Sequence, residues 1–145
     1  MPDNSPQSYK SHARFDPLFH FFLLPIAYTT VLLTAYNLYR RFTLLDAWLF
    51  VVCLAFAVAV MKIRMYALHV QDRTIRLEER IRLAMLLPEP LRARIGELTP
   101  GQLIALRFAS DAELPSLVEQ ALANQWTNKE IKQNVQNWRP DHFRV

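Results

Sequence analysis

The chain has 145 residues, which is about one small domain's worth of sequence. Apolar residues make up 52% of it and charged residues 21%, but the amino-terminal half is apolar whereas the carboxy-terminal half is charged. The net charge of +4 does not indicate nucleic-acid binding, because the basic residues alternate with acidic ones along predicted helical faces. The single cysteine, Cys53, excludes a disulfide or a cysteine-based metal site within one chain.

Residues 1–16 form a polar tail without apolar periodicity. Residues 17–39 then form a run without formal charge if His20 is neutral, and this run is long enough for one membrane-spanning helix. Asp16 and Pro17 suit the start of that helix, whereas Pro25 predicts a kink inside it. Lys10 and Arg14 precede the run, and we expect both to contact lipid headgroups.

Residues 44–87 contain neither glycine nor proline and predict one continuous helix, about 66 Å long at 1.5 Å per residue. The first part, residues 44–61, is apolar and predicts a second membrane span. The four residues between the two spans are too few for anything but an antiparallel return, so residues 17–61 predict a transmembrane hairpin. The remainder, residues 62–87, predicts an amphipathic extension that projects from the membrane, with Lys62 and Arg64 among lipid headgroups.

The distribution of basic residues predicts the orientation of the hairpin. The connection carries Arg40 and Arg41, whereas more basic residues lie near the other ends of the spans. The positive-inside rule therefore places both termini in the cytoplasm, with the protein in a bacterial inner membrane. The basic residues on the cytoplasmic side are Lys10, Arg14, Lys62, Arg64, Arg73 and Arg76.

Beyond the second span, apolar side chains recur at intervals of three and four residues and predict one apolar stripe along the helix. Residues 88–145 predict a cytoplasmic region of short helices, and we expect their apolar faces to cover this stripe. These helices are predicted at residues 91–98 and after the capping sequences that begin at Thr99, Ser110 and Thr127. The predicted stripe consists of Val70, Thr74, Leu77, Ile81, Ala84 and Met85.

Three blocks, ARFDPLFHFFLLP, YALHVQDRTIRLEER and QLIALRFASDAELPSLV, resemble a family of small bacterial integral membrane proteins that is known only as a domain of unknown function. The resemblance covers nearly the whole chain. It implies two amino-terminal membrane spans and a helical cytoplasmic tail, and it implies no activity, because no catalytic or ligand residues are assigned in the family.

His20 and His69 are the candidates for binding a haem or a chlorophyll-type pigment, since histidine in a membrane segment often marks a functional site. In an antiparallel hairpin, His69 would be displaced from His20 by about 9 Å along the axis, so the two would not clamp one ligand within a chain. A hydrogen-bonded or interfacial histidine is the favoured interpretation of each, and no cofactor is the default expectation.

The end of the chain is aromatic and basic, and it is the candidate for partner binding or for contact with the membrane surface. Packing within the helical region is an equal alternative for the tryptophans. The sequence contains no catalytic motif and so predicts no enzyme. It predicts instead an all-helical accessory or scaffold subunit of a larger membrane complex or homo-oligomer. The alternative functions are a tetrapyrrole-binding subunit and a membrane-anchored adaptor that docks a soluble partner. The candidate partner-binding residues are Trp126, Trp138, Arg139, Phe143 and Arg144.

Overall fold

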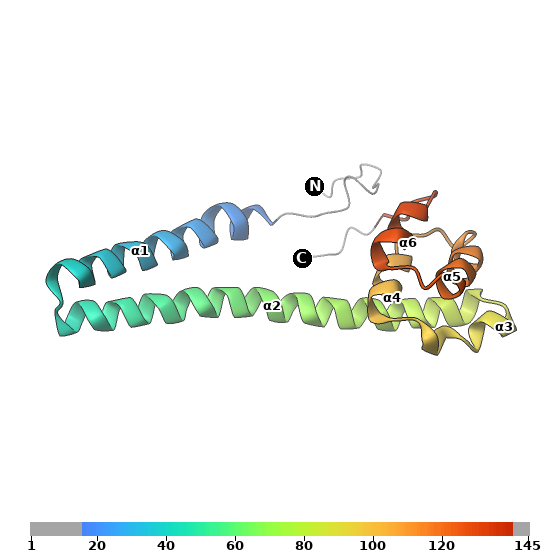
Figure 1. The fold of residues 1–145 in the computed structure, drawn as a ribbon, viewed down its shortest axis with the longest axis horizontal. Coiled ribbons are helices and arrows are strands. Elements are labelled where there is room, and N and C mark those ends of the chain that lie inside the picture. The colour runs from blue at the N-terminus through green and yellow to red at the C-terminus, as the bar shows by residue number, and fades with distance from the viewer. Residues whose placement is uncertain (1–15, 141–145) are drawn as a thin grey trace. The chain divides into compact units, whose positions relative to one another are not determined.

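The computed structural model describes residues 16–140, and within them it confirms the predicted all-helical class, with no β-strand and one isolated bridge between Ala109 and Trp138 (Figure 1). The predictions for Lys10, Arg14, Phe143 and Arg144 lie outside the described residues. The elements, in chain order, are the π-helical turn η1 (Phe19–Leu23), α1 (Leu24–Arg41), α2 (Leu44–Leu86), α3 (Glu89–Arg92), the 3-10 turn η2 (Ile95–Glu97), α4 (Pro100–Leu106), α5 (Leu114–Ala123) and α6 (Asn128–Asn134).

The first helical segment begins as predicted, because the Asp16 carboxylate accepts a hydrogen bond from the Phe19 backbone N–H at 3.2 Å. A π-helical turn lies directly before Pro25, where the sequence predicts a kink, and in it the Leu24 N–H donates to the Phe19 carbonyl. A proline has no N–H and clashes with the preceding turn of an α-helix, and a wider turn accommodates both effects.

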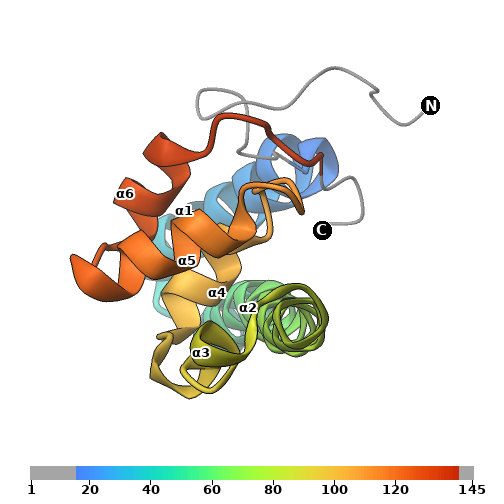
Figure 2. The ribbon, with the colours of Figure 1, turned by 90° about the vertical axis from the view of Figure 1, so that its right-hand side faces the viewer.

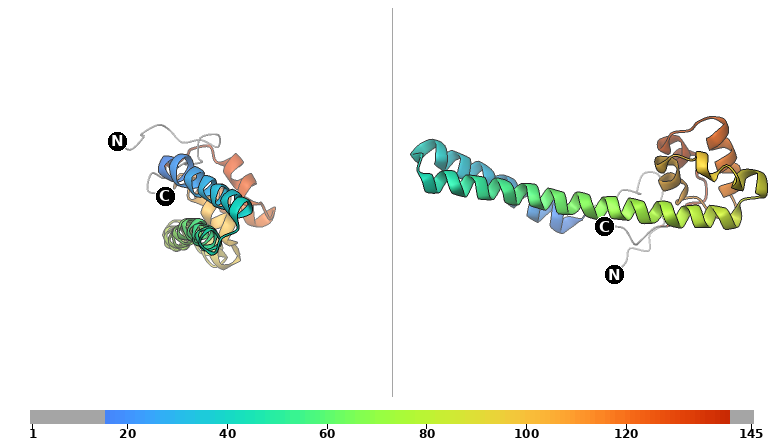
Figure 3. Two further views of the ribbon diagram at one scale, coloured as in Figure 1. Left: turned by 90° about the vertical axis from the view of Figure 1, so that its left-hand side faces the viewer. Right: turned by 90° about the horizontal axis from the view of Figure 1, so that it is seen from below.

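The connection between α1 and α2 consists of Phe42 and Thr43. Phe42 ends α1 in the left-handed conformation, with φ 43°. Thr43 caps α2, since its hydroxyl oxygen accepts from the Asp46 N–H at 3.1 Å. From there α2 runs for 43 residues as one helix, which confirms the predicted uninterrupted helix to within one residue at its end (Figure 3).

The described residues divide into two compact units, residues 16–69 and residues 70–140. In the second unit, the last turns of α2 and the short helices α3 to α6 enclose a hydrophobic core, with α3 to α6 gathered on one side of α2 (Figure 2). We call this unit the helical bundle. Its fully buried side chains include Leu83, Leu87, Leu103, Leu106, Phe108, Leu114, Val118 and Ile131.

The bundle does not cover the predicted stripe of α2. The buried residues of α2 are Ile75, Glu79 and Leu83, which form a different face of the helix. The stripe itself is open: Leu77 is 62% exposed and Met85 is 70% exposed. The prediction was wrong because the face that packs on the bundle includes the buried carboxylate of Glu79. In the sequence this face is therefore less apolar than the stripe.

The short helices mostly follow their predicted signals. Thr99 with Gln102, and Thr127 with Glu130, form complete capping boxes. The predicted helix over residues 91–98 is instead two short pieces, α3 and η2. Gly96 lies in the second piece, and glycine is unfavourable inside a helix. The Ser110 box is incomplete, because Glu113 binds the Ser110 N–H at 3.0 Å but the Ser110 hydroxyl is buried without a partner.

Candidate functional site

Much of the surface of residues 16–69 is apolar. Large side chains such as Phe21, Leu33 and Phe56 are exposed, and Phe19 and Ala27 are the buried residues among those described. Two helical segments, Phe19–Arg41 and α2, are long and apolar enough to cross a membrane. Apolar side chains left outside a core need an apolar surrounding, and a bilayer supplies one.

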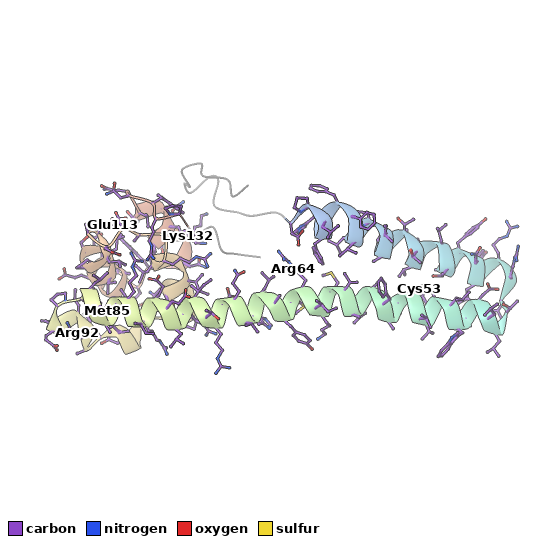
Figure 4. All side chains as sticks on the ribbon, turned by 180° about the vertical axis from the view of Figure 1, so that it is seen from behind. Cys53, Arg64, Met85, Arg92, Glu113 and Lys132 are labelled. Atoms are coloured by element: carbon purple, nitrogen blue, oxygen red, sulfur yellow. The ribbon has the colours of Figure 1, made fainter. Side chains whose placement is uncertain are left out.

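Arg64, a predicted headgroup contact, lies against the start of the first helical segment (Figure 4). Its guanidinium is 3.7 Å from the Asp16 carboxylate and 5.4 Å from the centre of the Phe19 ring. Only 13% of the Arg64 side chain is exposed, so an ion pair and a ring contact hold it within the protein. Lys62 is exposed and lies over the Tyr66 ring at 5.9 Å.

The two predicted cofactor ligands lie in different surroundings. His20 is half-buried, and its Nδ1 is 2.8 Å from the Asp16 carbonyl oxygen, a distance at which a protonated Nδ1 donates to that oxygen. His69 is exposed. Within residues 16–140, no three histidine, cysteine or acidic side chains are grouped to hold a metal ion. His20 therefore matches the favoured interpretation of a hydrogen-bonded histidine.

The main polar cluster of the bundle surrounds Arg82 of α2. The Arg82 Nε donates to the Asp111 carboxylate at 2.8 Å, and Nη2 donates to the Ala109 carbonyl at 2.7 Å. The Arg82 Nη1 donates to the Glu79 carboxylate at 3.2 Å. One guanidinium thus ties α2 to the segment that precedes α5.

Burial raises the pKa of Glu79, and the charge and hydrogen bond of Arg82 oppose this rise. The hydrogen bond from Arg82 lowers the pKa of Asp111, which is otherwise exposed. A cleft of about 570 Å³ opens beside these groups, and Arg139, Ile81 and Met85 also line it. Three carboxylates, of Glu78, Glu79 and Asp111, line the cleft with two guanidinium groups. Arg82 pairs with two of these carboxylates, which suits structural pairing better than acid–base chemistry.

The predicted partner-binding tryptophans both pack on the core of the bundle. Trp126 is half-buried, and its carbonyl accepts a hydrogen bond from the Gln102 side chain at 2.8 Å. The Trp138 ring lies 5.0 Å from the buried Phe108 ring, and its indole N–H donates to the Val135 carbonyl at 3.1 Å. Arg139 is exposed, and its backbone N–H donates to the Phe108 carbonyl at 2.7 Å.

The residues that hold the bundle together differ from those that the sequence predicts. Spacing predicts ion pairs of Asp72 with Arg76 and of Glu78 with Arg82. In the structure, Arg76 Nε donates to the Asp72 backbone carbonyl, and Arg82 binds Glu79 and Asp111. Glu113 belongs to the predicted capping sequence that begins at Ser110, yet its carboxylate also accepts from the Gln136 N–H at 3.2 Å. The pairs of Arg82 with Asp111 and of Glu113 with Gln136 join residues that are 29 and 23 positions apart, so no local spacing indicates them.

These features define a class: an all-helical protein in which two long apolar helices precede a small helical bundle with its own core. A model of a family of unknown function, DUF6526, matches residues 3–145. The chain belongs to that family. No curated protein and no solved structure matches the chain.

Proposed function

We propose that the protein is a membrane-anchored scaffold subunit: α1 and residues 44–61 of α2 form an antiparallel transmembrane hairpin, and α2 continues out of the bilayer to carry the helical bundle. The observation that supports this most is the contrast within one unbroken helix. The first part of α2 has no buried residue, whereas its last part contributes Ile75, Glu79 and Leu83 to the bundle. A helix that passes from a bilayer into water needs apolar side chains on its surface in the first part and a folded unit packed against it in the second part.

Local geometry supports the hairpin. The two-residue connection and the left-handed Phe42 turn the chain sharply after α1. The contacts of Arg64 with Asp16 and Phe19 join the other end of the hairpin, because they lie before the first span and just after the second. In this arrangement Arg64 lies near one membrane surface and Arg41 near the other, and the count of basic residues places the termini in the cytoplasm of a bacterial cell.

A non-catalytic role is supported by how the charged groups are used. The carboxylates of Glu79, Asp111 and Glu113 all accept hydrogen bonds that join segments of the bundle. The bundle then acts as a docking platform for another subunit of a membrane complex.

Purification of the full chain in a mild detergent, after washing the membranes with alkaline carbonate, tests this proposal. We expect the chain to remain in the washed membranes and to purify with a stoichiometric partner or as a homo-oligomer, without visible absorption. Release by carbonate, or a stable monomer with no partner, would contradict it. A tetrapyrrole-binding subunit would instead show a visible spectrum that is lost in His20→Ala or His69→Ala.

A further inference from the structure

The open stripe of α2 has the register of a coiled coil. Within the bundle unit, Val70, Leu77 and Ala84 recur every seven residues, and Thr74 and Ile81 lie between them at four- and three-residue steps. These are the d and a positions of a heptad repeat. The same register extends back along the sequence through Ile63 and Ala67.

The bundle occupies the opposite side of this register. Its contacts with α2 are made by Ile75, Glu79 and Leu83, which are the b, f and c positions, on the outside of a coiled coil. The a and d positions remain exposed, with Val70 at 66%, Leu77 at 62% and Ile81 at 51%. The Thr74 hydroxyl donates to the Val70 carbonyl at 3.1 Å, so its polar group is satisfied within the helix.

The residues in the stripe and beside it favour a two-stranded parallel coiled coil. Ile81 at an a position and Leu77 at a d position favour two strands in a parallel assembly. Arg73 is a g position and Glu78 is the e position five residues later, so in a parallel pair each Arg73 faces Glu78 of the other helix. An antiparallel pair would place arginines opposite arginines, since Arg73 and Arg80 both occupy g positions.

We infer that the open stripe of α2 is a homodimer interface, in which a second copy of this chain packs in parallel and in register along Val70, Thr74, Leu77, Ile81 and Ala84. The second copy covers the apolar face that the chain's own bundle leaves exposed. The inference does not rest on the proposed scaffold function, because the register and the exposed side chains lie in residues 70–86.

Disulfide cross-linking of the full chain, purified in mild detergent, tests this interface. Cys53 is first replaced by alanine, because the repeat extended along the sequence also places it at an a position. Val70→Cys, Leu77→Cys and Ala84→Cys are then oxidised separately, and the exposed Glu119→Cys on α5 serves as the control for random collision. The first and last of these d positions are about 21 Å apart along the helix.

We expect all three d-position variants to form dimers at least about tenfold faster than Glu119→Cys, because packing gives each thiol a high local concentration of its partner. An antiparallel pair would cross-link efficiently at no more than one of the three levels, and that result would overturn the inference. Rates equal to the control at all three positions would also overturn it. Since the replaced side chains are exposed, the fold of the bundle is retained, and the hydrogen exchange of its amides verifies this.

Charge reversal gives an independent check in the Leu77→Cys background. Arg73→Glu should slow cross-linking by about threefold or more, because two attractive pairs become repulsive. Glu78→Arg added to Arg73→Glu should restore the rate. Arg80→Glu is the matched control, since Arg80 faces the uncharged Met85 in a parallel pair and its reversal should change the rate least. Equal effects of Arg73→Glu and Arg80→Glu would overturn the assigned register.

Discussion

Arg82 is the residue on which the attachment of α2 to the bundle depends most. Its side chain is 12% exposed, it pairs with a Glu79 side chain that is 7% exposed, and it also binds the Ala109 carbonyl. Arg82→Ala should destabilise the bundle by about 3 kcal/mol, because it leaves a buried carboxylate without its partner. Hydrogen exchange of the α4 and α5 amides measures this loss.

The exposed pair of Arg94 with Glu97 is the matched control for Arg82. Arg94→Ala should leave exchange in α4 and α5 unchanged, since a solvated ion pair contributes little to stability. Equal effects of the two substitutions would contradict the structural role assigned to Arg82.

Glu79 should make the stability of the bundle depend on pH. Its pKa is raised above the ordinary value of 4.5, so the folded bundle binds this proton more tightly than the unfolded chain does. The resulting stabilisation is fully present below pH 4.5 and is lost as the pH rises through the raised pKa. Glu79→Gln should remove this dependence while leaving an amide oxygen to accept from Arg82.

The measurement for Glu79 is the free energy of local opening, obtained from hydrogen exchange between pH 4 and pH 8 in both proteins. Relative to Glu79→Gln, the wild-type bundle should lose stability as the pH rises. A wild-type protein that gains stability relative to the variant over this range would show that the pKa of Glu79 is lowered instead.

At the scale of the elements, helix starts could be predicted from the sequence because their signals are local. Thr99 and Thr127 each lie three residues before a glutamine or a glutamate, and both form complete boxes. Thr43 likewise lies three residues before an acidic residue, Asp46, and caps α2. The covered face of α2 could not be predicted, because Arg82 is tied to the bundle through Ala109 and Asp111, which are 27 and 29 residues further along the chain.

The capping box of α6 is a direct test at this scale. The Thr127 hydroxyl oxygen accepts from the Glu130 N–H at 3.4 Å, and the Glu130 carboxylate accepts from the Thr127 N–H at 2.7 Å. Thr127→Ala should cost about 1 kcal/mol of stability, and Thr127→Ser should recover most of it. Hydrogen exchange of the α6 amides distinguishes the two variants. If these amides exchanged as slowly in Thr127→Ala as in the wild type, the capping box would contribute little to stability.

At the scale of the whole molecule, α2 is the element that contributes residues to both units. Its first residues have no core to join, and its last residues are part of a core. Composition along the chain predicts this division. The pairings that close the bundle, such as Glu113 with the backbone of Gln136, are tertiary and carry no sequence signal.

The central claim is that α1 and the first part of α2 cross a bilayer and return, so that the α1–α2 connection and the bundle lie on opposite sides. Labelling with a membrane-impermeant thiol reagent in sealed vesicles tests it most directly, with Cys53→Ala as the background and single cysteines at Arg41 or Glu119. We predict that intact vesicles of one orientation label one site only, that vesicles of the other orientation label the other, and that detergent exposes both. Labelling of both sites from the same side would contradict the transmembrane hairpin.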